Sequence, residues 1–191
     1  MLIALDIAIL PPPAISQRAI ELSAALPEKE SIGLRLGDDN LPHITLTQQF
    51  IQASDLDAAL DRVGAALDEF EALPLRVTGP AKGSSSVWMA IESTPALIEL
   101  HRRLMDELRP FERPDGTAAG FVDGEARAGD VVWVAGFRRS SSYATFMPHI
   151  TLGHATDLPA VEPRAFDATA VAACHLGKFC ACRRVLRTWA L

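Results

Sequence analysis

The pentapeptide Pro-His-Ile-Thr-Leu occurs twice in this chain, at residues 42–46 and 148–152. An identical repeat indicates either a duplication or a shared constraint. Alternate side chains of an extended strand share a face, so the histidine and threonine of each copy lie together, opposite the isoleucine and leucine. Each copy therefore predicts a strand with an apolar face for the core and a polar face for chemistry.

The two polar faces suggest a reaction. A single His-x-Thr is most often part of an ordinary half-buried strand, but packing alone does not explain histidine and threonine on both outward faces. Two imidazoles can supply an acid and a base near neutral pH, and threonine hydroxyls can donate to the oxygens of an anion. His43 and His149, with Thr45 and Thr151, therefore predict phosphodiester chemistry that requires no metal.

Other segments predict the remaining strands and the helices. Short apolar or alternating runs predict strands at residues 2–10, 31–37, 43–50, 73–79, 85–93, 131–137, 148–152, 168–179 and 183–191. Apolar residues at helical spacing predict helices at residues 14–26, 54–70 and 94–108. The second helix opens at Ser54, which forms a variant capping box with Asp57, and the third opens at Thr94 before a proline. His101 is expected as an ordinary histidine on the face of that helix.

The order of these elements predicts the fold class. Short strands interleaved with three helices predict an α+β fold with mainly antiparallel sheets. Residues 112–130 lose periodicity and are expected to form a long loop or a lid. No linker divides the chain, so residues 1–191 are expected to form a single domain.

Charge and hydropathy exclude several classes of protein. A net charge of −6 argues against a protein that coats long nucleic acid. Residues 164–191 carry five basic side chains against one acidic side chain, so a small anion at a local basic site fits better. The first ten residues lack a basic leader, and no apolar run approaches the roughly 20 residues of a membrane span. We expect a cytoplasmic monomer without membrane contact.

The three cysteines, Cys174, Cys180 and Cys182, are an odd number clustered in one short segment, which argues against a disulfide framework. Together with His175 their spacing matches no familiar zinc pattern, and structural packing is the expected role. Zinc at His149 and His154 is a competing interpretation. We expect neither a metal nor another cofactor.

Two His-x-Thr strands about a hundred residues apart resemble the 2H phosphoesterase superfamily, specifically its bacterial 2′-5′ RNA ligase-like branch. The resemblance covers nearly the whole chain, including the ending "LGKF…VLRTWAL". It implies a bilobal fold with pseudo-twofold symmetry, in which helices lie outside two sheets and each half brings one motif to a central cleft. It also implies catalytic roles for His43 and His149, and phosphate-binding roles for Thr45 and Thr151.

The resemblance implies a cyclic nucleotide phosphodiesterase or 2′-5′ RNA ligase-like hydrolase. Its expected substrates are RNA 3′ ends or small nucleotides with 2′,3′-cyclic phosphates or 2′-5′ linkages, with ligation as the possible reverse reaction. Alternatives are ADP-ribose cyclic phosphate or another small metabolite as substrate, and a non-catalytic nucleotide-binding module.

The chain also departs from the family pattern. His154 stands where many relatives have an arginine, three residues after the second motif threonine, so Arg138, Arg139 or the basic carboxy-terminal strand could supply that phosphate contact. Tyr143 and Phe146 are candidates to stack on a base, although core packing is an equal expectation for Phe146.

Overall fold

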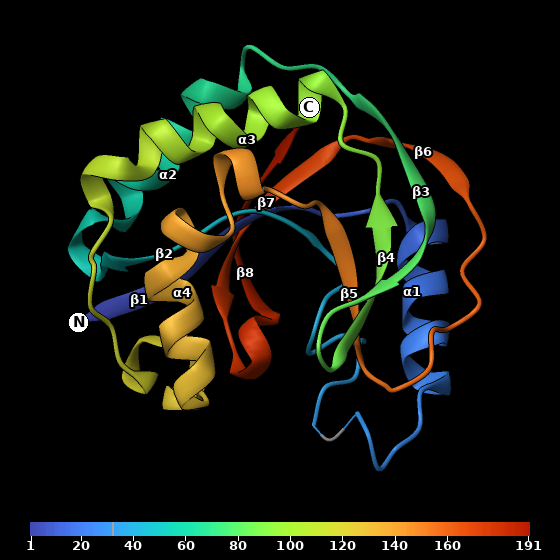
Figure 1. The fold of residues 1–191 in the computed structure, drawn as a ribbon. Helices are drawn as coiled ribbons and strands as arrows, with labels where there is room; N and C mark the ends of the chain where they lie inside the picture. The colour runs from blue at the N-terminus through green and yellow to red at the C-terminus, as the bar shows by residue number, and fades with distance from the viewer. Residues whose placement is uncertain (32) are drawn as a thin grey trace.

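The computed structural model describes residues 1–31 and 33–191, and its eight strands form two antiparallel four-stranded sheets (Figure 1). The first sheet has the order β2-β1-β7-β8 and contains β1 (Leu2–Ile9), β2 (Ile44–Gln52), β7 (Ala170–Leu176) and β8 (Cys182–Ala190). The second has the order β5-β4-β3-β6 and contains β3 (Leu73–Lys82), β4 (Ser86–Ile91), β5 (His149–His154) and β6 (Arg164–Ala168). The expected α+β fold with two antiparallel sheets is confirmed.

Two helices each follow a strand of one sheet but pack on the other sheet. The helix α1 (Pro13–Ala25) joins β1 to β2 of the first sheet, but it packs on β5 of the second. The helix α3 (Pro95–Leu108) follows β4 of the second sheet and packs on β2 of the first. Each motif strand is an edge strand, and β2 and β5 contact one another. Because α1 packs on β5 and α3 packs on β2, these two helices hold the two motif strands together.

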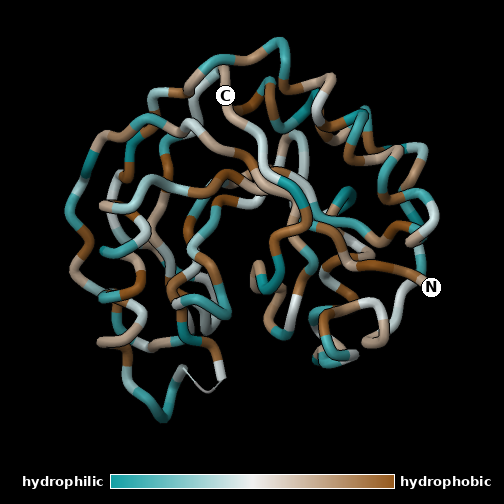
Figure 2. Tube along the Cα trace, turned by 180° about the vertical axis from the view of Figure 1, so that it is seen from behind, coloured by the Kyte–Doolittle hydropathy of each residue, from teal (hydrophilic) through white to brown (hydrophobic). Residues whose placement is uncertain are grey.

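The inner face of each element carries apolar side chains, and these form the core. Figure 2 shows hydrophobic residues running along the strands. The helix α2 (Leu56–Leu67) buries Leu60, Val63 and Leu67, as the spacing predicts. The Thr94 side chain accepts a hydrogen bond from the Leu97 N–H and begins α3, as predicted. The capping box predicted at Ser54 is wrong, because the Ser54 hydroxyl donates to Asp55 and α2 begins at Leu56 without a side-chain cap.

The strand predicted at residues 131–137 is wrong, because these residues lie in the helix α4 (Ala128–Ser140). The run of valine and tryptophan favours extended backbone on propensity. Hydrogen bonds to Asp130 in the first turn favour the helix instead: the Arg127 N–H donates to the Asp130 carboxylate at 2.9 Å, and the Arg127 guanidinium donates to the same carboxylate. Val134 and Phe137 are buried three residues apart, which is helical spacing.

The strand predicted at residues 31–37 is also not formed by the described part of that segment, and Ile32 lies outside the described residues. Arg35 donates to the carbonyls of Ser23 and Leu26 at the end of α1, and the Leu36 N–H donates to the Ser23 hydroxyl. The polar groups of this segment therefore satisfy a helix end instead of a sheet edge. Sequence reasoning also missed β6, a short edge strand with mostly exposed side chains.

The segment expected as a loop or lid is irregular from Glu112 to Arg127, with short 3-10 turns, before α4 begins. It packs against β2: the Arg113 N–H donates to the Phe50 carbonyl, and Gly116 lies so close to the Phe50 ring that a Cβ would clash with it. Closure of this segment over a site remains a prediction. No helix that the structure describes has the length and apolar character needed to cross a membrane.

Candidate active site

The two motif histidines have the same local geometry. The Nδ1 atom of His43 lies 2.8 Å from the Leu41 carbonyl, and that of His149 lies 2.7 Å from the Met147 carbonyl. A carbonyl only accepts, so both Nδ1 atoms carry a proton, and Nε2 is the basic nitrogen of each neutral ring. Each histidine thus offers Nε2 for proton transfer, in the tautomer that its own backbone fixes.

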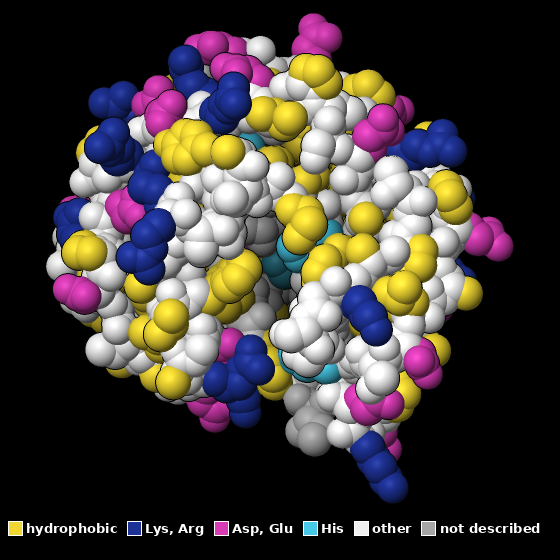
Figure 3. Space-filling view, viewed as in Figure 1, with side chains coloured by type: hydrophobic (Ala, Val, Ile, Leu, Met, Phe, Trp, Pro, Cys, Tyr) yellow, Lys and Arg dark blue, Asp and Glu magenta, His cyan; other side chains and the backbone are white. Residues whose placement is uncertain are grey.

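Both histidines line one open cleft of about 790 Å³ between the motif strands. Figure 3 shows histidine side chains inside a hollow in the middle of the view, with hydrophobic side chains around it. The volume lies in the range of ligand sites, about 300–1,000 Å³. The lining includes the two motif threonines together with Trp88, Arg127, Trp133, Phe146, His154 and Phe179.

A buried carboxylate lies beside the first histidine. The Nε2 atom of His43 is 3.8 Å from Oδ2 of Asp6, whose side chain is 0% exposed on β1. The same oxygen accepts hydrogen bonds from the Thr45 hydroxyl at 2.9 Å and from the Gln48 amide at 2.7 Å. Burial raises the pKa of Asp6, and the nearby His43 imidazole acts in the opposite direction. The proton of Thr45 is therefore engaged by Asp6 in this structure.

The second histidine has an aromatic neighbour instead. The rings of His149 and Trp88 have centroids 5.0 Å apart. Burial lowers the pKa of His149, and the positive charge that His43 can carry lowers it further. Within the described residues Thr151 makes no side-chain hydrogen bond, so its hydroxyl is available to an anion in the cleft. The two halves share their geometry but differ in their electrostatics.

Arg127 supplies the cleft with a cation that sequence reasoning missed. Its guanidinium lies 4.0 Å from the centre of the Phe179 ring and pairs with Asp130 at 2.6 Å. Burial acts to raise the pKa of Asp130, but the hydrogen bonds from Arg127 outweigh it and leave the pKa lowered. Asp130 is therefore ionised and fixes Arg127 beside the cleft. No spacing rule would have indicated this arginine, because it lies at the N-cap of α4, a helix whose residues have the propensity of a strand.

Of the further residues predicted to bind the substrate, some line the cleft and others do not. His154 and Phe146 line the cleft. Arg138 instead pairs with Glu112 and donates to the Tyr143 hydroxyl, which in turn donates to Asp106. These contacts hold Arg138 and Tyr143 away from the cleft lining. Arg139 is exposed and also lies outside that lining.

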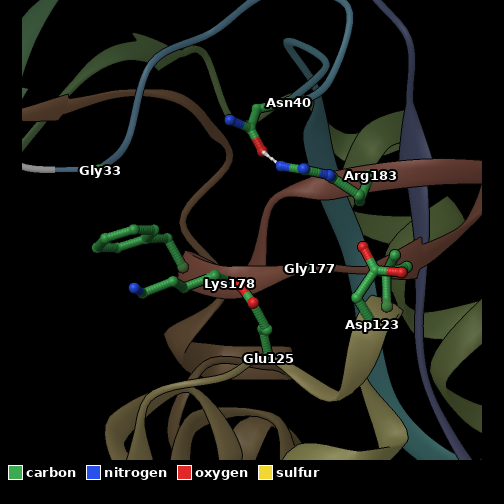
Figure 4. A pocket seen from close by; sticks show the side chains of 9 residues that line it. Gly33, Asn40, Asp123, Glu125, Gly177, Lys178 and Arg183 are labelled. Atoms are coloured by element: carbon green, nitrogen blue, oxygen red, sulfur yellow. Dashed lines mark hydrogen bonds between the residues drawn. The ribbon is translucent and has the colours of Figure 1, made fainter.

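The basic carboxy-terminal strand faces a different, smaller cavity of about 170 Å³ (Figure 4). Lys178 and Arg183 line it, but so do Asp123 and Glu125. Arg183 donates to the Asn40 side chain at 3.4 Å. This mixed charge gives the small cavity no clear preference for an anion.

His101 has a structural role that the expectation of an ordinary helix-face histidine did not include. Its Nδ1 lies 2.6 Å from the Leu46 carbonyl of β2, and its Nε2 accepts the Tyr143 N–H at 2.8 Å. Its ring stacks on Phe146 with centroids 3.9 Å apart. Burial lowers the pKa of His101, so the neutral ring is the folded form. His101 thus connects the first motif strand to the segment that leads into the second.

One group of potential metal ligands comes together within the described residues, from Asp6, His43 and Cys182, with ligand atoms within 4.8 Å of one another. Burial raises the pKa of the Cys182 thiol well above its usual range, so the thiol keeps its proton in the absence of a metal. We assign no metal site to the group. His149 and His154, the pair of the competing zinc interpretation, belong to no such group among the described residues.

Comparisons with known proteins identify the family of this chain and the fold it shares with solved structures. The family profile described as the 2′-5′ RNA ligase superfamily matches residues 11–175. The crystal structure of E. coli LigT complexed with 3′-AMP has a TM-score of 0.64 and 19% identity, with 100% of this chain and 99% of LigT covered. The LigT complex with ATP has a TM-score of 0.63 and the same identity and coverage. TT0787 of Thermus thermophilus has a TM-score of 0.59 and 15% identity, with 98% and 97% covered. No curated protein sequence matches the chain.

Proposed function

We propose that this chain, which belongs to the 2′-5′ RNA ligase superfamily, is a metal-independent phosphodiesterase. This is the activity that its resemblance to the 2H phosphoesterases implies. Its proposed substrates are 2′,3′-cyclic phosphates or 2′-5′ linkages at RNA ends or in small nucleotides. The observation that carries the proposal is the pair of histidines at one cleft, each presenting Nε2 through the same backbone hydrogen bond.

The proposed reaction is an in-line displacement at phosphorus. One imidazole takes a proton from water through Nε2 as the new P–O bond forms, and the other gives a proton to the departing oxygen as the old P–O bond breaks. The Thr151 hydroxyl donates to a phosphoryl oxygen, and the Arg127 guanidinium supports the negative charge of the phosphoryl group. Reverse ligation uses the same groups with the two proton transfers exchanged.

The cleft supports a nucleotide as the substrate. LigT has been crystallised with 3′-AMP and with ATP, and in this chain the aromatic side chains of Trp133 and Phe146 line the open cleft that holds the two motif histidines. Aromatic rings bind bases of any identity by stacking. ADP-ribose cyclic phosphate, which also carries an adenine, is the alternative substrate. A non-catalytic nucleotide-binding module is the alternative from another class, and the presence of both histidines argues against it.

The test is an activity screen with purified protein against 2′,3′-cyclic mononucleotides, 2′-5′ dinucleotides and ADP-ribose cyclic phosphate. Phosphorus NMR should detect a 2′-monophosphate from the cyclic mononucleotide, because the family resemblance implies that the 3′ oxygen leaves. His43→Ala and His149→Ala should each reduce turnover by about 10²-fold or more, and the double variant should lose little further. Exhaustive treatment with EDTA should leave turnover unchanged.

Two results would contradict the proposal. Either single histidine variant could retain near wild-type turnover while circular dichroism shows a folded protein. Alternatively, the wild type could bind nucleotides without turning over any member of the panel, which would support the binding module.

A further inference from the structure

The turn between β7 and β8 holds two consecutive residues other than glycine in the left-handed region of the backbone. The φ of Phe179 is +67° and that of Cys180 is +54°. Residues with side chains adopt this conformation at a cost in free energy, and strained positions of this kind cluster at ligand-binding sites. Both residues line the cleft that holds the two motif histidines. The turn therefore carries its strain at the wall of the candidate active site.

One buried carboxylate holds this turn against the start of α4. The Asp130 side chain, which is 2% exposed, accepts the Phe179 N–H at 3.0 Å from a position 49 residues away in the chain. The same carboxylate accepts the Nε–H and an Nη2–H of Arg127, at 3.0 Å and 2.6 Å. Gly33 lies against the edge of the Phe179 ring, where a Cβ would come within 3.1 Å of it. The ring and the guanidinium are thus both fixed in position.

The Arg127 guanidinium lies over the Phe179 ring, with Cζ 4.0 Å from the ring centre. Asp130 binds the edge formed by Nε and Nη2, and within the described residues Nη1 makes no hydrogen bond. The Arg127 side chain is 45% exposed and lines the cleft. One face of the guanidinium is therefore covered and one edge is bound, whereas the other face and the Nη1 edge are open to a ligand.

We propose that Arg127, stacked on Phe179, forms a second base-binding surface in the cleft. This inference rests on the proposed function and narrows the substrate class to a diester that joins two nucleosides. Guanidinium planes and aromatic rings are the surfaces on which unpaired bases stack in proteins that bind RNA. The Nη1 edge stays available to donate to the phosphoryl group, so the two roles of Arg127 are compatible.

The first base-binding surface is the exposed indole of Trp133, which lines the same cleft. Trp133 comes six residues after Arg127, which corresponds to about 9 Å along the axis of α4. Bases that stack on one another are only about 3.4 Å apart. Two bases bound at Trp133 and at Arg127 are therefore unstacked from each other, and the diester that joins them is exposed to the cleft.

The test compares a 2′-5′ dinucleotide with two analogues, each of which keeps the diester and both riboses but lacks one of the two bases. With the wild type, removal of either base should reduce kcat/KM by about 5- to 150-fold, the effect of losing one stacked base. Phe179→Leu should raise KM by at least about fivefold more for the dinucleotide than for the analogue without the base at Arg127. Trp133→Ala should show this difference with the other analogue.

Arg127→Lys separates stacking from charge, because lysine keeps the positive charge but lacks the planar guanidinium. Its loss of kcat/KM should follow the pattern of Phe179→Leu across the three compounds. Arg102→Lys makes the same change at an exposed position of α3 outside the cleft lining, and it is the matched control. Equal losses for Arg127→Lys on the dinucleotide and on both analogues would show that Arg127 acts through charge alone, which would overturn the proposal.

The wild type keeps the proposal testable if the variants do not fold. Equal kcat/KM for the dinucleotide and for either analogue would mean that only one base is bound, and the second surface would be refuted. Failure of the proposed function gives a different result, because the wild type then turns over none of the three compounds. In that case calorimetry should still measure weaker binding of each analogue than of the dinucleotide, and equal binding would refute the surface itself.

Discussion

Trp133 leaves 46% of its surface exposed although it lines the cleft, and it projects from a helix whose neighbouring Val134 is buried. A large indole at the wall of an open cleft suits base stacking, which contributes about 1–3 kcal/mol for each base. We therefore expect Trp133→Ala to raise KM for a nucleotide substrate about 5- to 150-fold while kcat changes little.

The matched control is Val132→Ala, because Val132 is the preceding residue, is 70% exposed and lies outside the cleft lining. Steady-state kinetics of both variants on one substrate would check the prediction. Equal kinetics for Trp133→Ala and the wild type would remove this residue from the base-binding wall.

For individual residues, the sequence predicted the histidines that we propose as the reacting groups, but not the residues around them. The two histidines were predictable because identical residues recur in an identical strand pattern. Asp6 was not, since it lies within an apolar strand far from the motif and reaches His43 only through the β1–β2 register. Arg127 and Trp133 likewise depend on a helix whose residues have the propensity of a strand.

Among the elements, α3 joins the two motif regions through His101. The hydrogen bonds of this buried ring to the Leu46 carbonyl and the Tyr143 N–H leave buried polar groups unsatisfied when it is removed, at about 1–3 kcal/mol for each group. His101→Ala should therefore lower the free energy of unfolding by a few kcal/mol at pH 7.5. Urea unfolding monitored by circular dichroism would measure it.

The same histidine should make stability depend on pH. Its pKa is lowered in the folded protein, so its contribution is fully present above the unfolded value of about 6.5 and is lost as the pH falls below that value. His149 has a shift in the same direction and adds to the effect in the wild type. His101→Ala should thus lose less stability between pH 7.5 and pH 5 than the wild type. An unchanged slope would show that His101 does not carry this dependence.

Element types were predictable where one physical signal dominated. The apolar stripe of α2 and the alternation in β3 agree with the structure. The prediction failed at residues 31–37 and 131–137, where side-chain hydrogen bonds to helix ends decided the backbone. Such bonds join residues whose proximity cannot be read from hydropathy alone.

The molecule as a whole should unfold in one transition, because α1 and α3 each pack on the sheet of the other half. Trp88 lies in the second sheet and Trp189 in the first, so each reports on its own half. Variants that retain only one of these tryptophans should show the same unfolding midpoint by fluorescence. Two separate midpoints would mean that the halves unfold independently.

Gly153 of β5 lies against the end of α1, so a substitution there tests whether the two halves unfold together. A Cβ on this residue would clash with the Ser31 hydroxyl and lie 2.8 Å from the Leu26 side chain, and the φ of +148° disfavours other residues. Gly153→Ala should cost about 1–3 kcal/mol, which lowers Tm by about 2–4 °C for each kcal/mol. The substitution should lower the unfolding midpoint reported by Trp88 and the one reported by Trp189 by the same amount. Gly37→Ala, where a Cβ meets no neighbouring atom, is the control.

The position of β1 in the first sheet has a consequence for synthesis on the ribosome. This strand lies between β2 and β7, so its second edge stays unpaired until residues 170–176 have been translated. For most of elongation β2, which follows His43, therefore belongs to an incomplete first sheet. The second sheet has all its strands once β6 has left the ribosome. The nascent chain must therefore keep an apolar strand edge shielded for most of its synthesis, and a chaperone that binds extended apolar segments should contact β1 until the final strands are released.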